Sequence, residues 1–167
     1  MAEWPRFRPG ELLQQLVANG VDFVVVGGLA AVMHGSAAIT RDLDITYAPD
    51  QENLDRLGQA LVGLGARLRG VTDDVPFIPD GRTLTRTRIL TLATPDGSID
   101  LLAQPDGAPI YARLRERAWR AKLAGVEVQI ASLDDLIAMK KAAGRPKDLV
   151  AVEELEAIQR LQRERGG

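Results

Sequence analysis

An apolar run that ends at two glycines, and is soon followed by a pair of aspartates, is the feature that most constrains how this chain can fold. Residues 22–26 (DFVVV) are mostly apolar and β-branched, which predicts a short buried strand. Residues 28–34 predict one or two turns of helix that end at a third glycine. Residues 42–47 (DLDITY) predict a second strand, although aspartate is a poor strand former. Two carboxylates therefore stand in an element that ordinarily excludes them.

The spacing of the acidic residues suggests why two aspartates lie in a strand. Side chains two residues apart point to the same face of a strand, so Asp42 and Asp44 project together while Leu43 and Ile45 face the core. Asp100 lies in another predicted strand, and pairing the two strands would bring three carboxylates to one edge. Neighbouring carboxylates repel unless a cation lies between them, and Mg²⁺ prefers such oxygen ligands. The pattern indicates a metal site for phosphoryl or nucleotidyl transfer, although Asp-x-Asp alone would also fit a turn and a surface ion pair.

Gly27 and Gly28 stand where the first strand passes into the short helix. Glycine permits positive φ and a close approach of the backbone to a ligand, and the first N–H groups of a helix can bind phosphate. The sequence contains neither the G-x-G-x-x-G fingerprint nor the G-x-x-x-x-G-K-[ST] loop. A tight turn without a ligand would also explain the two glycines.

The remaining elements follow from periodicity and from Gly/Pro signals. Helices are predicted at residues 11–18, from 49 to about 64, after Pro109, at 133–143 and from 146 to about 163; strands at 86–93, 99–103 and 126–130; and a loop at 71–82. Before residue 132 helices and strands mix, whereas after it only helix is predicted. We expect an α/β core over residues 1–131 and a C-terminal helical extension over residues 132–167 that packs on the core.

Composition excludes several classes of site and partner. The 167 residues include no cysteine and one histidine, which excludes disulfides, thiolate zinc sites and sites with several histidine ligands. The formal net charge of −2 excludes attraction of the whole chain to nucleic acid, though not a local basic patch. No apolar run approaches the ~20 residues that span a bilayer, and the N-terminus lacks the apolar segment of a signal peptide. We expect a cytoplasmic protein with no membrane partner.

The order of these features resembles the polymerase-β-type nucleotidyltransferase superfamily. The segments GGLAAVMHG and ITRDLDI are similar to its small bacterial branch, the AbiEii-like toxins of type IV toxin–antitoxin systems. The segment SLDDLIAMKKAAGRPKDLVAVEEL resembles the C-terminal helical motif of that branch, so the resemblance touches residues 23–155. It implies an α/β (α+β) fold, with a mixed β-sheet nucleotidyltransferase core, flanking helices and a C-terminal helical pair.

The resemblance also implies roles for the acids and glycines. Mg²⁺ (or Mn²⁺) would bridge Asp42, Asp44 and Asp100 to an NTP, and Asp100 would help to activate the attacking hydroxyl. Gly27 and Gly28 would hold the triphosphate. Many members of the superfamily have serine after the first glycine, where this chain has Gly28, so that hydroxyl contact is missing while the backbone N–H remains.

Basic residues near the two motifs are further candidates. The apolar helical stripe of residues 133–137 continues at Lys140, where a lysine either reaches solvent or points into a cleft. In the toxin-like branch, positions matching Lys140 and Asp148 belong to the active site, although Asp148 would also suit the first turn of a helix. Arg41 could contact phosphate or pair with a carboxylate. Arg145 and Lys147 could bind phosphate or face solvent.

The function that the resemblance implies is Mg²⁺-dependent transfer of a nucleoside monophosphate from an NTP to a hydroxyl group. The acceptor would be an RNA such as tRNA, a protein or a small molecule. The toxin-like branch further implies a toxin role with an antitoxin protein as partner. The alternative is a nucleotide-binding or regulatory module that keeps the fold and has little activity.

Overall fold

The structure is a computed structural model that describes residues 6–70, 77 and 79–166. Helices and strands alternate through most of the chain and only helices follow the last strand. In chain order the elements are α1 (Pro9–Ala18), β1 (Phe23–Val26), α2 (Gly27–Met33), β2 (Asp42–Tyr47), α3 (Gln51–Gly63), β3 (Arg67–Leu68), α4 (Gly81–Arg86), β4 (Ile89–Thr94), β5 (Gly97–Leu102), α5 (Tyr111–Arg117), β6 (Trp119–Leu123), β7 (Val126–Ile130), α6 (Leu133–Ala143) and α7 (Pro146–Gly166).

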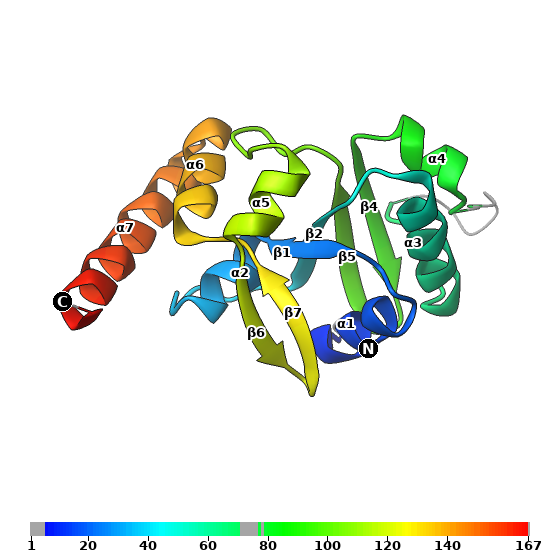
Figure 1. Cartoon of the computed structure of the whole chain (residues 1–167), viewed down its shortest axis with the longest axis horizontal. Coiled ribbons are helices and arrows are strands. Elements are labelled where there is room, and N and C mark those ends of the chain that lie inside the picture. The colour runs from blue at the N-terminus through cyan, green and yellow to red at the C-terminus, as the bar shows by residue number, and fades with distance from the viewer. Residues whose placement is uncertain (1–5, 71–76, 78, 167) are drawn as a thin grey trace.

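The strands form one mixed sheet in the order β3-β4-β5-β2-β1-β7-β6. β1 is antiparallel to β2 and parallel to β7, while β2 is parallel to β5. Figure 1 shows the α6–α7 pair at one end of the molecule and α3 with α4 at the other. The predicted fold class, a mixed sheet with flanking helices and a C-terminal helical pair, is confirmed.

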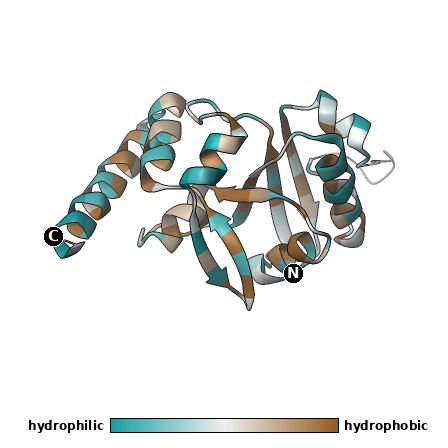
Figure 2. Cartoon of the chain, in the orientation of Figure 1, coloured by the Kyte–Doolittle hydropathy of each residue, from teal (hydrophilic) through white to brown (hydrophobic). Residues whose placement is uncertain are grey.

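Alternation along the central strands directs the aliphatic side chains to one face. Leu43 and Ile45 of β2 and Ile99 and Leu101 of β5 are all fully buried. The apolar stripe of α1 packs near this face, since α1 contacts β2, β7 and α3. Figure 2 shows the consequence: β1 at the centre is hydrophobic, whereas the edge strand β6 is mainly hydrophilic.

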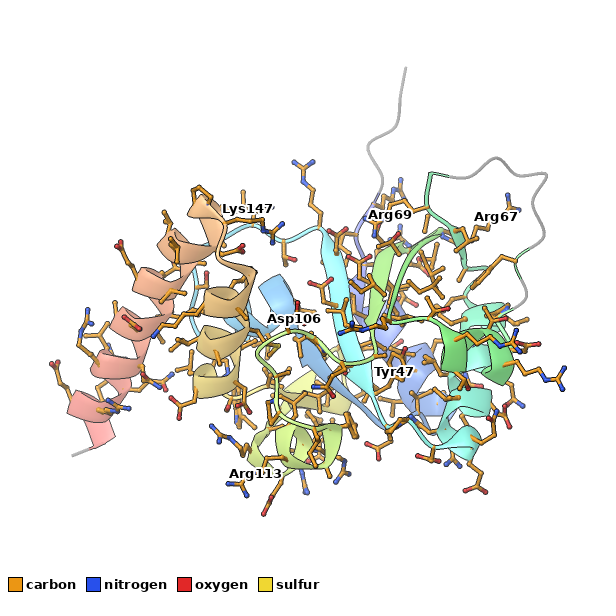
Figure 3. All side chains as sticks on the ribbon, turned by 90° about the horizontal axis from the view of Figure 1, so that it is seen from above. Tyr47, Arg67, Arg69, Asp106, Arg113 and Lys147 are labelled. Carbon is orange, nitrogen blue, oxygen red and sulfur yellow. The ribbon has the colours of Figure 1, made fainter. Side chains whose placement is uncertain are left out.

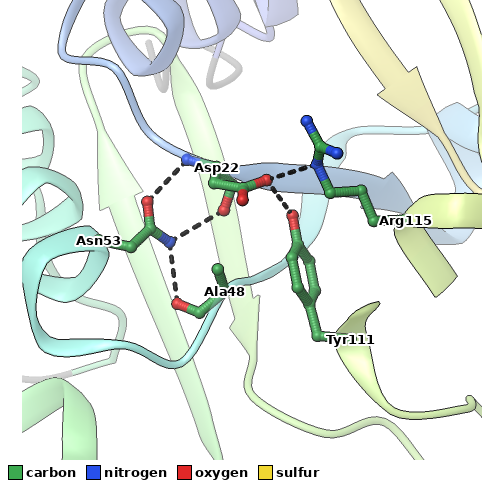
Figure 4. Close-up of polar contacts among 5 residues, drawn as sticks. All are labelled: Asp22, Ala48, Asn53, Tyr111 and Arg115. Carbon is green, nitrogen blue, oxygen red and sulfur yellow. Dashed lines mark hydrogen bonds and ion pairs between the residues drawn. The ribbon is translucent and has the colours of Figure 1, made fainter. Parts of the chain in front are cut away.

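A polar network fastens the start of β1 to two helices (Figure 4). The carboxylate of Asp22 accepts hydrogen bonds from the Tyr111 hydroxyl at 2.6 Å and from the Arg115 Nε at 2.9 Å. The side-chain amide of Asn53 accepts from the Asp22 N–H and donates to the carbonyls of Asp22 and Ala48. These bonds lie where β1 begins, so they fix the strand whose other end leads into the glycines.

Strong local signals define the C-terminal helices. Ser132 caps α6 by accepting a hydrogen bond from the Asp135 N–H, and Gly144 ends the helix in the left-handed conformation (φ 66°). α6 contacts α2 and α7, and the carboxylate of Glu154 in α7 accepts hydrogen bonds from the Ser36 hydroxyl and the Ala37 N–H. The division of the chain into units 1–131 and 132–167 stays a prediction.

Several predicted boundaries are wrong, in each case near a short or exposed element. The predicted loop at 71–82 ends earlier than expected because α4 begins at Gly81, and residues 71–76 and 78 lie outside the described residues. Arg86 ends α4 and does not start a strand, since β4 begins at Ile89. The basic helix after Pro109 ends at Arg117, and the edge strand β6 follows it. No helix among the described residues is both long and apolar enough to cross a membrane.

Candidate active site

Asp42, Asp44 and Asp100 project from neighbouring parallel strands. β2 pairs with β5 so that Asp44 lies directly opposite Asp100, with Asp42 two residues earlier on the same face of β2. Leu43 and Ile45 lie fully buried on the opposite face. The expectation that pairing of the two strands would gather three carboxylates is therefore confirmed as geometry.

The environment of Asp44 disfavours its charged form. Its Oδ1 is buried and has no hydrogen-bond partner among the described residues. Burial, together with the charge and a hydrogen bond of Asp100, raises the pKa of Asp44 to about 7, and the charge of Asp42 adds to this effect. Lys140 acts in the opposite direction. Burial also raises the pKa of Asp100, against the lowering effect of Arg69. Near neutral pH the cluster therefore tends to hold a proton in place of a cation.

Arg69 is the cation closest to the carboxylates, and no local pattern predicts it there. Its guanidinium donates through NH2 to the Asp100 Oδ1 and lies 3.7 Å, through NH1, from the Asp42 Oδ1. Asp44 has no such ion pair in the described part of the chain. Figure 3 shows Arg69 and Arg67 on the side of the sheet away from α6 and α7.

A cavity of about 470 Å³ opens on the other side of Asp44. Its walls come from the end of β1 with Gly27, from β4 and the segment after β5, and from α6 with the start of α7. Its apolar lining includes Ile89, Leu102, Leu136 and Met139, and its polar lining includes Arg88, Gln104, Asp106, Lys140, Arg145 and Asp148. In Figure 3 Asp106 lies between the α6–α7 pair and the strands, which marks the position of this cavity.

Lys140 faces this cavity from α6 and is held there by Asp148. The Lys140 Nζ lies 3.4 Å from the Asp148 Oδ1, with the lysine side chain 31% exposed and the aspartate side chain 1% exposed. Arg145 binds the other carboxylate oxygen of Asp148. Its Nε donates to the Asp148 Oδ2 at 2.6 Å, and its backbone N–H donates to the same oxygen at 3.2 Å. The hydrogen bond from Arg145 is the main cause that lowers the pKa of Asp148 to about 2. Asp148 is thus a fixed anion that orients two cations at the cavity.

The two glycines serve different steric needs. Gly27 has φ +67°, and a Cβ there would collide with the Asp44 carboxylate, so only glycine lets the chain turn from β1 into α2 beside this residue. A Cβ at Gly28 would lie 2.9 Å from the Thr40 Oγ1. Thr40 therefore accounts locally for glycine at a position where the resemblance leads one to expect serine.

The candidate residues divide into three groups in space. Asp44, Gly27, Lys140 and Asp148 line one cavity. Asp42 and Asp100 lie beside Asp44 and pair with Arg69, while Gly28 packs against Thr40. Arg41 and Lys147 are exposed and do not line the cavity.

The donor chemistry of the cluster fits a divalent cation. Carboxylate oxygens are the ligands that Mg²⁺ prefers, and the unsatisfied Oδ1 of Asp44 is free to act as one. Within residues 6–70, 77 and 79–166, however, no group of three or more His, Asp or Glu side chains is placed to hold a metal ion as it stands. The guanidinium of Arg69, which holds Asp42 and Asp100, gives a physical reason for this.

Sequence reasoning missed Arg69, the pairing of Arg145 with Asp148, and the apolar wall of the cavity. Arg145 carried a signal, because it precedes by three residues an aspartate at the start of a helix, a spacing at which an arginine can reach the carboxylate. Arg69 carried none, since its partners lie 27 and 31 residues away in sequence. Predicting the apolar wall requires knowledge of which strands lie against α6.

Two solved structures have a similar arrangement over nearly the whole chain. The lincosamide antibiotic adenylyltransferase LnuA, in a lincomycin-bound form, matches with a TM-score of 0.61 and 14% sequence identity, covering 93% of this chain and 99% of that one. ANT(2″)-Ia, in complex with adenylyl-2″-tobramycin, matches with a TM-score of 0.53 and 16% identity, covering 95% of this chain and 99% of that one.

Comparison of sequences adds nothing to this likeness, because no protein-family model and no curated protein matches the chain. At identities of 14% and 16% the structural likeness concerns the fold alone. The chain therefore has the fold of nucleotidyltransferases, and it shares this fold along almost its entire length.

Proposed function

We propose that this protein is a nucleotidyltransferase that moves a nucleoside monophosphate from an NTP to a hydroxyl group of a small molecule. The observation that carries the proposal is the row of Asp42, Asp44 and Asp100 on paired strands, beside a cavity that Lys140 also lines. The fold shared with the adenylyltransferase LnuA and with ANT(2″)-Ia supports the same class of reaction.

In this proposal the three aspartates hold Mg²⁺ (or Mn²⁺), which when bound supplies positive charge for the triphosphate. Gly27 and Gly28 present backbone N–H groups to the phosphates at the start of α2. Arg41 and Lys147, which lie outside the cavity, are second-rank candidates for phosphate contacts, because both are exposed and positively charged.

The proposed reaction forms a bond between the acceptor oxygen and the α-phosphorus and breaks the bond from that phosphorus to the bridging oxygen, so that pyrophosphate leaves. Asp100, which lies opposite Asp44 on the neighbouring strand, takes the proton of the hydroxyl. Lys140 offsets negative charge on the phosphate oxygens. Asp148 orients Lys140 and thereby fixes the position of that charge.

A small-molecule acceptor is favoured over a macromolecular one. The cavity has the size of ordinary small-molecule sites, and its apolar lining gives an acceptor a surface against which to pack. The two structures of similar fold were solved with adenylyl-2″-tobramycin and with lincomycin. This supports an acceptor of the size of a small molecule. The AbiEii-like resemblance implies three more specific properties. These are transfer to tRNA or protein, a toxin role with an antitoxin partner, and action in the cytoplasm.

The test uses each of the four NTPs labelled at the α-phosphate, in parallel with γ-labelled ATP, and three acceptor pools: tRNA, lysate protein and the small-molecule fraction of a lysate. We expect label from the α-position in the small-molecule fraction, and none from Asp44→Asn protein. Glu153→Gln, which changes an exposed carboxylate of α7 outside the cavity, should retain transfer.

Label in tRNA or protein would support the toxin role and overturn the small-molecule acceptor. Transfer only from γ-labelled ATP would indicate a kinase. Nucleotide binding without any transfer would support the binding-module alternative, which the pairing of Arg69 with two of the three acids also favours.

A further inference from the structure

Arg69 reaches the acids across the sheet by a route that its backbone fixes. The Arg69 N–H donates to the Thr91 carbonyl at 3.0 Å, one residue beyond the end of β3. Thr91 is the partner of Asp100 in the β4–β5 pair, and Asp100 is the partner of Asp44 in the β5–β2 pair. Arg69, Thr91, Asp100 and Asp44 thus form one row across four strands, which directs the guanidinium onto the carboxylates.

The guanidinium of Arg69 supplies positive charge to the carboxylates, as a bound metal ion would. It donates to Asp100 and lies near Asp42, so it offsets the repulsion between carboxylates that burial in one row creates. Arg69 contacts Oδ1 of Asp42 and Oδ1 of Asp100, so a divalent ion that binds these acids meets the positive charge of the guanidinium at short range. The two cations therefore compete for the carboxylates, and metal binding favours displacement of the guanidinium.

The displaced guanidinium needs a new anion. A bound nucleotide provides one, because a planar guanidinium binds phosphate oxygens in a bidentate manner. Metal alone would leave Arg69 without a partner beside a new positive charge, whereas metal with a triphosphate would give both cations their ligands.

We propose that Arg69 is a built-in counter-cation that excludes Mg²⁺ from the acid cluster until a nucleotide is bound, so that metal and nucleotide enter together. This inference rests on the proposed function, since it assumes that the three acids are metal ligands. By linkage, Arg69 raises the coupling between metal and nucleotide to the same extent in both directions.

The variant Arg69→Gln removes the charge and keeps much of the length of the side chain. Arg67→Gln is the matched control, because Arg67 precedes Arg69 by two residues, lies in β3 and is exposed. Binding of Mn²⁺ is measured by electron paramagnetic resonance, first alone and then with a non-hydrolysable ATP analogue, and Tm is measured in EDTA.

We expect Arg69→Gln to bind Mn²⁺ alone about tenfold more tightly than the parent, as the loss of two half-exposed ion pairs implies. The analogue should tighten Mn²⁺ binding strongly in the parent and in Arg67→Gln, and much less in Arg69→Gln. In EDTA, Arg69→Gln should melt about 3 °C or more below Arg67→Gln, and Mn²⁺ should restore its Tm.

Equal Mn²⁺ affinity of Arg69→Gln and parent, with or without the analogue, would overturn the inference while leaving the proposed function intact. Failure of the parent to bind Mn²⁺ even with the analogue would overturn the metal site itself. If Arg69→Gln does not fold, Arg69→Lys decides: its single ammonium cannot bridge two carboxylates as the guanidinium does, so its affinity for Mn²⁺ alone should exceed that of the parent, and an unchanged affinity contradicts the inference.

Discussion

Replacing Asp44 by asparagine should stabilise the metal-free protein at alkaline pH and have little effect in acid. The pKa of Asp44 is raised from 3.8 to about 7 in the folded state, first by burial and then by Asp100. At a pH between 3.8 and about 7, Asp44 binds a proton in the folded protein and not in the unfolded chain. The free energy of unfolding therefore falls as the pH rises from about 4 through 7, and Asp44→Asn lacks this loss.

The magnitude follows from the size of the shift. The difference between about 7 and 3.8 is about 3 pH units, or about 4 kcal/mol at 25 °C. The asparagine amide leaves one buried polar atom without a partner, as Oδ1 of Asp44 does in the parent, so this cost is the same in both proteins. We expect Asp44→Asn to be more stable than the parent by up to about 4 kcal/mol at pH 8 and by about zero below pH 4.

Urea denaturation in EDTA, followed by circular dichroism from pH 4 to pH 9, measures this difference. Asp106→Asn is the control, because its side chain is 86% exposed and its replacement should change the free energy of unfolding little at any pH. An Asp44→Asn protein that is less stable than the parent at pH 8 would refute the reasoning. So would a difference between the two proteins that is the same at pH 4 and at pH 8.

Three further substitutions test other parts of the site and fold. Lys140→Met should lower kcat about 100-fold with little change in Tm, whereas Lys141→Met, one residue along α6, should retain activity; equal effects would remove Lys140 from the site. Tyr111→Phe should lose about 1 kcal/mol in urea denaturation, because the hydroxyl bonded to the carboxylate at the start of β1 is removed; no loss would mean that this network adds nothing. Gly27→Ala should lower the Tm much more than Gly144→Ala, since both residues have nearly the same positive φ and only the former would meet a carboxylate; similar losses would show that backbone strain alone matters.

Local signals in the sequence were sufficient to predict the strands that carry the three aspartates. The alternation in residues 42–47 places two aspartates on one face and two aliphatic residues on the other, whatever the partner strand is. The C-terminal helices were predictable for a similar reason, since Ser132 and Gly144 mark the two ends of α6.

The missed elements lack such signals. β6 (Trp119–Leu123) is an edge strand with one buried residue, Ala121, so its sequence reads as a continuation of the basic helix before it. β3 has two residues, and α4 has six and depends on a cap from Asp80. β3 follows from its pairing with β4, a strand distant in sequence, and the contact of Arg69 with the acids also depends on distant residues, whereas β6 pairs with the next strand, β7.

The central claim is that Asp42, Asp44 and Asp100 form one metal–nucleotide site, and calorimetric titration of NTP into the protein tests it most directly. We expect binding that requires Mg²⁺ and that disappears in Asp42→Ala/Asp44→Ala protein. Glu153→Ala/Glu156→Ala, which removes two carboxylates of α7 outside the cavity, should bind as the parent does. Binding of NTP with Mg²⁺ by the Asp42→Ala/Asp44→Ala protein as tightly as by the parent would contradict the claim and assign the nucleotide to another part of the molecule.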